Sequence, residues 1–238
     1  MKSRSSIVSL VLSLLLALSG FAAELNFPGT KAIDPVKLLP APPSPDSAES
    51  RAELALMVGI QRYRTPAEVD CCRAEVNLTA AAYASVLGPW LKAENLPALE
   101  ALFRKLDSDS KFLSGTAKAH FGRKRPAVVD QRIQTAIENE TSLAYPSGHA
   151  TRGMMYALVL AQLAPEKRDA LLERGREIGW NRVIAGLHRP SDIVAGRVLG
   201  QALVRQLLED PKFQEELAKA KAEFDEVKQK NAPPPSNQ

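Results

Sequence analysis

The sequence predicts an all-α fold, in which a proline-rich N-terminal arm precedes a single helical bundle. Most of the chain carries apolar residues at three- and four-residue spacing, the periodicity of helices that bury one face. The alternation of apolar and polar residues that is typical of strands is absent. With 238 residues, of which 45% are hydrophobic and 24% charged, the chain has the size and composition of one folded domain.

The first 22 residues have the build of a signal peptide. Lys2 and Arg4 precede an apolar run from Ile7 to Leu18, and small residues follow it. This run is shorter than the roughly 20 residues that a membrane-spanning helix needs. We therefore expect cleavage after Ala22, a periplasmic or secreted protein, and no stable membrane insertion. An uncleaved signal anchor is the alternative.

Residues 23–49 form the predicted arm. The stretch from Phe27 to Ser47 holds six prolines and has no periodicity, so we expect it to be extended. Residues 50–229 are expected to form the helical domain, which has no internal repeat and no segment apolar enough to cross a membrane. Residues 230–238, which are polar and rich in proline, are expected to be a disordered tail.

Seven segments carry the helical pattern, and two of them have further features. Residues Met154–Leu163 are apolar nearly all round, which predicts a helix at the centre of the bundle. Ala195, Gly196 and Gly200 are small, so we expect another helix to approach closely there. The seven segments are residues 47–64, 77–91, 96–106, 114–122, 149–163, 166–187 and 190–210.

Charge and cysteine content exclude several classes of function. The net charge is only +4, and no basic arm or aromatic–basic pattern is present, so no nucleic-acid partner is expected. The two cysteines, Cys71 and Cys72, are adjacent, and adjacent cysteines rarely have the geometry of a disulfide. Two free thiols, an intermolecular bridge or a rare vicinal disulfide remain open. No histidine lies near them, so no metal site is expected.

The stretch Pro146-Ser147-Gly148-His149 precedes the most apolar helical segment. Ser147 is a good N-cap, and the first N–H groups of a helix lack internal acceptors and carry partial positive charge. Such a helix end binds anions such as phosphate. Gly148 would let the backbone come close to an oxyanion. Simple helix capping is the alternative interpretation.

Arg182 is expected to point into the bundle. It continues a stripe with Leu171, Gly175 and Ile178 at spacings of four, three and four residues. A buried guanidinium needs an anion beside it. That anion is either a protein carboxylate or a bound phosphate, which a guanidinium binds through two parallel hydrogen bonds.

His188 and Asp192 have the spacing of an oriented catalytic histidine. A carboxylate four residues after a histidine can accept its Nδ1–H, which leaves Nε2 free and more basic. The alternative is that Asp192, in the first turn of a helix that begins at Pro190, only complements the helix dipole.

Lys118 and Arg125 lie in a third polar stretch. Pro126 keeps Arg125 out of helical conformation, so the preceding helix must end near Gly122. A solvated basic run is the alternative for these cations, and His120 fits no catalytic pattern. With Arg182, Ser147, Gly148 and the two histidines, however, they suit phosphoryl transfer, where catalysis is mostly positioning and charge stabilisation.

In this order and spacing, the motifs resemble the three-part signature of the phosphatidic acid phosphatase type 2 (PAP2) superfamily. The motifs are Lys118-x6-Arg125-Pro126, Pro146-Ser147-Gly148-His149 and Arg182-x5-His188-x3-Asp192. With its signal peptide and without membrane helices, the chain is most similar to the secreted class A bacterial non-specific acid phosphatases. The resemblance covers roughly residues 40–210 and implies a helical bundle of the PAP2 kind.

The resemblance also implies roles for individual residues. His188 would attack phosphorus and form a phosphohistidine, Asp192 would orient it, and His149 would protonate the leaving alcohol and then activate water. No metal or other cofactor is required, vanadate should mimic the transition state, and a homo-oligomer is suggested. Phosphate would be held by Lys118, Arg125, Ser147, Gly148 and Arg182. One departure is Asn181, where the family usually has serine; its amide could donate a hydrogen bond in place of the serine.

We therefore expect an acid phosphatase that hydrolyses small phosphate monoesters of broad type. A phosphatase for lipid phosphates or diphosphates is one alternative, and a vanadate-dependent haloperoxidase is another, which the short chain disfavours. An exported helical protein that only binds phosphate is the non-enzymatic alternative. Because a histidine of ordinary pKa, near 6.5, must be protonated to act as the acid, activity should peak on the acidic side.

Overall fold

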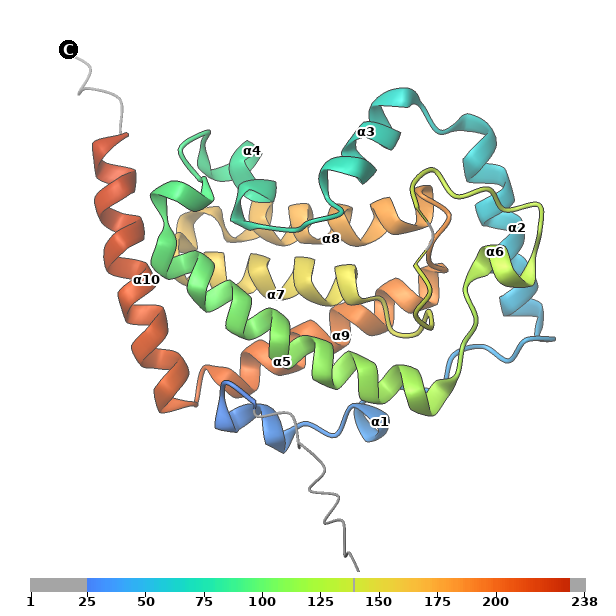
Figure 1. Cartoon of the computed structure of the whole chain (residues 1–238), viewed down its shortest axis with the longest axis horizontal. Helices are drawn as coiled ribbons and strands as arrows, with labels where there is room; N and C mark the ends of the chain where they lie inside the picture. Colours follow the sequence, from blue (N-terminus) through green and yellow to red (C-terminus); the bar gives the residue numbers. More distant parts are fainter. Residues whose placement is uncertain (1–24, 139, 232–238) are drawn as a thin grey trace, which may run out of the picture.

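The computed structural model describes residues 25–138 and 140–231, and every regular element in these ranges is a helix. The all-α prediction is confirmed. Three helices, α7 (Gly148–Leu163), α8 (Arg168–Ile184) and α9 (Pro190–Leu207), form the centre of the molecule. Helix α7 packs against both of the others, and the long helix α5 (Pro97–Phe121) crosses in front of them (Figure 1).

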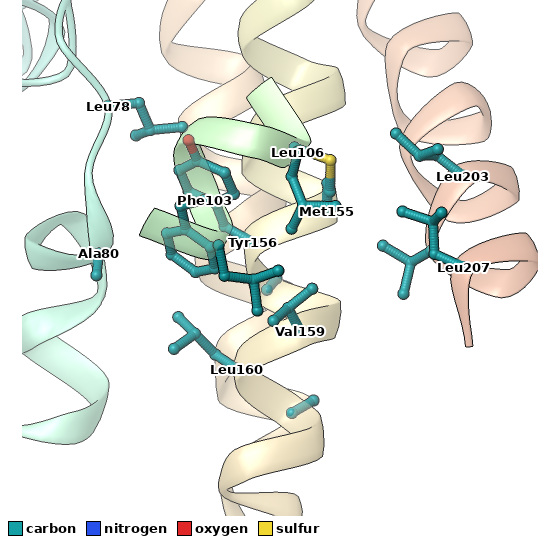
Figure 2. Packing of buried hydrophobic residues seen from close by; sticks show 14 of the residues in the cluster. Leu78, Ala80, Phe103, Leu106, Met155, Tyr156, Val159, Leu160, Leu203 and Leu207 are labelled. Atoms are coloured by element: carbon teal, nitrogen blue, oxygen red, sulfur yellow. The ribbon is translucent and has the colours of Figure 1, made fainter. Parts of the chain in front are cut away.

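Helix α7 is central because its sequence is apolar on nearly every side. Met154, Met155, Val159 and Leu160 are all buried, although they point in different directions around the helix. Tyr156 stacks on Phe103 of α5, with ring centroids 3.9 Å apart and planes 9° from parallel (Figure 2). The predicted central helix is therefore confirmed. Its packing on all sides holds the residues at the start of α7, around Gly148, in place.

Small residues let α9 approach α7 closely, as the sequence predicts. A Cβ atom on Gly196 would lie 2.5 Å from the carbonyl oxygen of Ser147, and one on Gly200 would lie 2.5 Å from that of Thr151. Both distances are too short for any side chain. The contact holds the N-terminal ends of α7 and α9 side by side.

Helix α5 joins two of the segments that the sequence separates. Residues 96–106 and 114–122 belong to a single helix, because the intervening polar residues find buried partners. Asp109, fully buried, accepts hydrogen bonds from the backbone N–H of Phe27 at 3.0 Å and from the hydroxyl of Thr30 at 2.8 Å. The helix ends at Gly122, whose φ of 61° is left-handed, and this confirms the predicted end of the helix.

The same contacts fix the N-terminal arm, which is less extended than expected. It contains a short 3-10 helix, η1 (Pro28–Ala32), and a four-residue helix, α1 (Pro35–Leu38). Phe27 is buried edge-on against Phe213, with ring centroids 5.5 Å apart. The arm is thus part of the core at its beginning, because a large aromatic residue there has a pocket to fill.

Besides the four-residue helix α6 (Pro126–Val129), two longer helices of the domain were not among the seven predicted segments. Helix α3 (Pro66–Ala74) begins with a capping box between Thr65 and Glu68, and α10 (Pro211–Lys230) begins at the N-cap Asp210. Both start with N-cap and proline signals that the sequence displays. Helix α10 packs against α5 at one end of the molecule (Figure 1).

The prediction of one continuous helix over residues 77–91 is mostly wrong. This segment contains only the 3-10 helix η2 (Ala80–Tyr83) and α4 (Ala84–Leu87), because Gly88 ends the helix with a φ of 116°. The remaining helices are α2 (Ala48–Tyr63), which confirms the first segment, α6 (Pro126–Val129), and two 3-10 turns, η3 (Ala93–Asn95) and η4 (Pro165–Lys167).

The predicted signal peptide and most of the predicted tail lie outside the described residues. Helix α10 runs through Lys230, so the first residue assigned to the tail is helical. Among the helices of residues 25–138 and 140–231, none combines the length and the hydrophobicity needed to cross a membrane.

Candidate active site

The candidate residues meet at one end of the bundle, where α5 and α8 end and α7 and α9 begin (Figure 1). The N-terminus of α7, at Gly148, directs backbone N–H groups and partial positive charge to this end. The N-terminus of α9, at Pro190, adds partial positive charge, but its first N–H, that of Ser191, already donates to Glu53 at 2.6 Å. The connection from α6 to α7 passes over it and contributes Glu140 and Ser142.

His188 is fully buried and has a defined orientation. Its Nδ1 lies 3.4 Å from Oδ2 of Asp192, and Nη1 of Arg125 lies 2.7 Å from its Nε2. Because a guanidinium only donates, Nε2 accepts and Nδ1 carries the proton that faces the carboxylate. Burial lowers the pKa of His188 below its ordinary value, which favours the neutral form of the ring.

Asp192 is fixed by residues that the sequence interpretation missed. Arg123 donates to its Oδ1 at 2.6 Å, and the backbone N–H of Arg189 donates to Oδ2 at 2.8 Å. The guanidinium of Arg123 also contacts Glu53, 2.8 Å away. Although burial opposes it, these bonds and His188 keep the pKa of Asp192 below its usual range. In the sequence Arg123 belongs to the basic run Arg123-Lys124-Arg125, which could be read as a solvated surface stretch, and this hid its role.

Arg125 uses all five of its N–H groups in the unliganded site. Nε donates to the carbonyl of Ser142 at 2.7 Å, and Nη2 donates to the Ser142 hydroxyl at 2.9 Å and to Glu140. Nη1 donates to the carbonyl of Leu187 at 3.2 Å as well as to His188. The side chain is 3% exposed and points at the catalytic histidine candidate.

Lys118 joins the same cluster through Ser142. Its Nζ lies 3.2 Å from the Ser142 hydroxyl. Burial and the neighbouring charge of Arg125 lower the pKa of Lys118 to about 8, so it remains a cation in neutral and acidic solution. Ser142 thus holds the two cations of the first motif, although nothing in the sequence marks it for this role.

Arg182 is fully buried, as predicted, and of the two anions that the sequence left open, the described residues supply the protein carboxylate, Glu75. Its Nη2 donates to the carbonyl of Cys72 at 2.8 Å and to Glu75 at 3.3 Å. Nε and Nη1 are buried and have no hydrogen-bond partner among the described residues. These two donors point to different edges of the guanidinium, so each could donate to a separate oxygen atom.

Ser147 and Gly148 form the start of α7. The Ser147 hydroxyl accepts a hydrogen bond from the backbone of Ala150 at 3.3 Å, and its own N–H donates to the carbonyl of Asp192 at 2.9 Å. Nothing lies within 4 Å of a Cβ built on Gly148, which lines a cavity of about 290 Å³. An anion could therefore reach the backbone N–H of Gly148.

His149 lines the same cavity but takes up a proton less readily than a free histidine does. Its Nε2 lies 3.2 Å from the carbonyl of Val76, which can only accept, so that nitrogen carries the proton. Nδ1 lies 3.3 Å from a guanidinium nitrogen of Arg152 and 3.7 Å from Glu140. Burial, then the charges of Arg152 and Arg182, lower its pKa to about 3. The ordinary pKa assumed from the sequence is wrong for the unliganded protein.

Asn181 does not point its amide at the cation cluster. Its Nδ2 donates to both carboxylate oxygens of Glu75, at 3.1 and 2.9 Å. Glu75 is buried and also pairs with Arg174 and Arg182. The expectation that Asn181 would stand in for a phosphate-binding serine is therefore not met, because a buried carboxylate claims its donor.

The cysteines are both free thiols. Cys71 is exposed and Cys72 is buried, with its Sγ 3.1 Å from the carbonyl of Asn181. The two thiols therefore do not form a vicinal disulfide with each other. Burial raises the pKa of Cys72, which keeps it protonated.

Taken together, the site brings three cations, two helix N-termini and two histidines to one end of the bundle, where Lys118, Gly148 and His149 line the cavity of about 290 Å³. Its electrostatics favour an anion with several oxygen atoms. One histidine is neutral and held by a carboxylate, as a nucleophile must be; the other needs additional negative charge before it takes up a proton. This combination can transfer a phosphoryl group.

Comparisons with known proteins agree with this chemistry. Residues 109–212 match the model of the PAP2 superfamily. The chain is 31% identical to the non-specific acid phosphatase of Providencia stuartii over 210 residues, which cover 84% of each chain. It is also 31% identical to the non-specific acid phosphatase of Salmonella typhimurium over 199 residues, 79% of each chain. A crystal structure described as the first transmembrane PAP2 type phosphatidylglycerolphosphate phosphatase from Bacillus subtilis matches with a TM-score of 0.49 and 18% identity, over 76% of this chain and 89% of that one.

Proposed function

Since the chain belongs to the PAP2 superfamily and is an acid phosphatase, we propose that it hydrolyses small phosphate monoesters of broad type through a phosphohistidine on His188. The observation that carries this proposal is the setting of His188. Its Nδ1 faces Asp192, and the electron pair of its Nε2 faces Arg125 in the cation cluster, which supports a phosphate site there.

The first chemical step forms a P–N bond and breaks the ester P–O bond. Nε2 of His188 attacks phosphorus in line with the leaving oxygen, and its electron pair becomes the new bond. The electrons of the broken bond go to the leaving oxygen, which takes a proton from His149 and departs as an alcohol. Asp192 stabilises the positive charge that develops on the His188 ring.

The second step returns the enzyme to its starting state. Water attacks the phosphorus of the phosphohistidine and gives a proton to His149, and the P–N bond breaks. Inorganic phosphate leaves, and Nε2 of His188 recovers its electron pair. His188 is thus the nucleophile of the first step and the leaving group of the second. His149 donates a proton in the first step and accepts one in the second.

The phosphate oxygens would be held by groups that the site leaves free or can free. Arg182 offers its unpaired Nε and Nη1, and Gly148 offers its backbone N–H. To bind the phosphate, Arg125 must give up its hydrogen bond to His188. Nε2 of His188 is then released for attack when substrate arrives. Lys118 adds charge, and Ser147 ends the helix whose N-terminus faces the anion.

Substrate binding would also prepare His149. Its pKa of about 3 in the free protein rises when a phosphate group brings negative charge into the cavity. The proton that His149 donates then enters with the substrate or after it, and this requires acidic solution. The sequence of residues 1–22 supports export to the periplasm, where soluble phosphate esters would be the substrates.

The direct test is hydrolysis of p-nitrophenyl phosphate at mildly acidic pH in the presence of a chelator. Wild type should turn over, and His188→Ala should lose at least about 10³-fold in kcat because no other group can attack. His120→Ala is the matched control, since His120 lies outside the cluster, and it should keep full activity. Turnover by His188→Ala at the wild-type rate would refute the phosphohistidine route.

A further inference from the structure

One carboxylate lies inside the cluster of cations, where the mechanism has no use for it. Glu140, which precedes the start of α7 by eight residues, places Oε2 on Nη2 of Arg125. Its Oε1 is 3.7 Å from Nδ1 of His149. Glu140 also lines the cavity of about 290 Å³ together with Lys118 and Gly148. These neighbours are the same groups that would surround a phosphate.

Glu140 is an anion at every pH at which the enzyme would work. Burial would raise the pKa of its carboxyl, but the charge of Arg125 above all, together with that of Lys118, outweighs burial and lowers the pKa to about 2. The site is therefore never an empty cation cluster. It already contains a negative charge, paired with the side chain that points at the nucleophile.

Arg125 has no spare donor for a second anion. Its five N–H groups are divided between Ser142, Leu187, His188 and Glu140. The bonds to Ser142 and Leu187 anchor the guanidinium to the backbone. A phosphate can therefore gain hydrogen bonds from Arg125 only by displacing His188, Glu140 or both. The Glu140 side chain is 36% exposed, so a path to solvent is open to it.

From this geometry we propose that Glu140 is a resident competing anion, which phosphate must displace from Arg125 and which weakens the binding of substrate and product alike. The proposal rests on the proposed function, because it takes the same cavity as the phosphate site. Its consequence for turnover is that inorganic phosphate is released more readily, since the carboxylate returns to Arg125 as the product leaves.

The test compares the binding of inorganic phosphate by wild type, Glu140→Gln and Glu138→Gln, with titration calorimetry on the full chain. Glutamine keeps the size of the side chain and removes the charge. Glu140→Gln should bind phosphate about tenfold more tightly, the usual scale for loss of one charged hydrogen bond. Glu138 is exposed, carries the same charge and is two residues away, so Glu138→Gln should bind as wild type does.

Steady-state kinetics distinguish competition between Glu140 and phosphate from an effect of Glu140 on the proton transfer by His149. For Glu140→Gln, KM and the inhibition constant of phosphate should fall together, and kcat should not rise. A fall in kcat with a shifted pH profile would show that Glu140 instead assists the proton donor, and would overturn the proposal. Equal or weaker phosphate binding by Glu140→Gln would overturn it as well.

Phosphate titration requires no turnover, so its outcome is independent of the phosphohistidine route. A protein whose His188→Ala variant kept full activity would refute that route and leave the affinity comparison intact. Glu140→Ala serves as a second variant and should also bind phosphate more tightly. Thermal unfolding of each variant, which should match wild type, shows that a changed affinity does not come from a changed fold.

Discussion

The two histidines of the site are set apart by what surrounds them. His188 keeps its proton on Nδ1, facing Asp192, and its lowered pKa favours the neutral ring that the proposed nucleophile needs. His149 shares the cavity with Arg152 and Glu140, and its proton affinity depends on the charge that the cavity contains. The two side chains are thus specialised by burial and neighbouring charge, which the residue type alone does not reveal.

The role of His149 predicts a dependence on the leaving group. His149→Asn removes the proton donor and should slow phenyl phosphate at least about tenfold more than p-nitrophenyl phosphate, because nitrophenolate is stable without a proton. Comparison of kcat/KM for the two esters in wild type and variant checks this. Equal losses for both esters would mean that His149 only binds phosphate.

The close contact between α7 and α9 places the two motifs that carry these histidines next to each other. Gly200 is one turn further into α9 than Gly196, and it has no room for a side chain against the carbonyl of Thr151. The geometry of the site therefore depends on the packing of two helices over more than a turn beyond the site itself.

A pair of glycine substitutions tests this packing. Gly200→Ala should lower the free energy of unfolding by about 1–3 kcal/mol, because the added Cβ pushes α9 away from α7. Gly59→Ala in α2 has open space around it and should raise the free energy of unfolding by about 0.5–1 kcal/mol through better helix propensity. Urea denaturation of both variants gives the comparison; equal effects would show that α9 does not need the close approach.

For the protein as a whole, the buried neutral histidines predict loss of stability in acid. His149 and His188 have lower pKa values folded than unfolded, so the unfolded chain binds more protons as the pH falls. Their contribution is complete above the unfolded pKa of about 6.5 and is lost as pH drops toward the folded pKa, about 3 for His149.

Thermal unfolding checks this linkage. Tm of the unliganded protein should fall between pH 7 and pH 4, and His149→Asn should make that fall smaller, because asparagine does not titrate. Inorganic phosphate should raise Tm at pH 5, since it binds the folded state alone. A Tm that stays constant or rises from pH 7 to pH 4 would contradict the assigned pKa shifts.

The sequence predicted the class of the fold and the residues with chemical signatures, but not their supports. Apolar periodicity identified α7, and small residues identified its contact with α9, because both are local patterns. Segment 77–91 failed because a helical composition there ends at Gly88, and the continuity of α5 depended on the distant partners of Asp109.

In the site, the missed residues all act through contacts between distant parts of the chain. Arg123 is seen as a support only once Asp192 lies beside it, and Glu75 only once Arg182 and Asn181 converge on it. Their residue types are common on protein surfaces, so no sequence pattern distinguishes them. Glu140 belongs to the same group, since its importance comes from its position on Arg125.

The most direct test of the account is to trap the covalent intermediate. Wild type mixed with a phosphate monoester and quenched in alkali, where phosphohistidine survives, should give a phosphorylated peptide whose modified residue is His188. The His188→Ala variant should give no such peptide. Phosphate found on His149 or on another residue, or turnover without any labelled peptide, would contradict the assignment of His188 as the nucleophile.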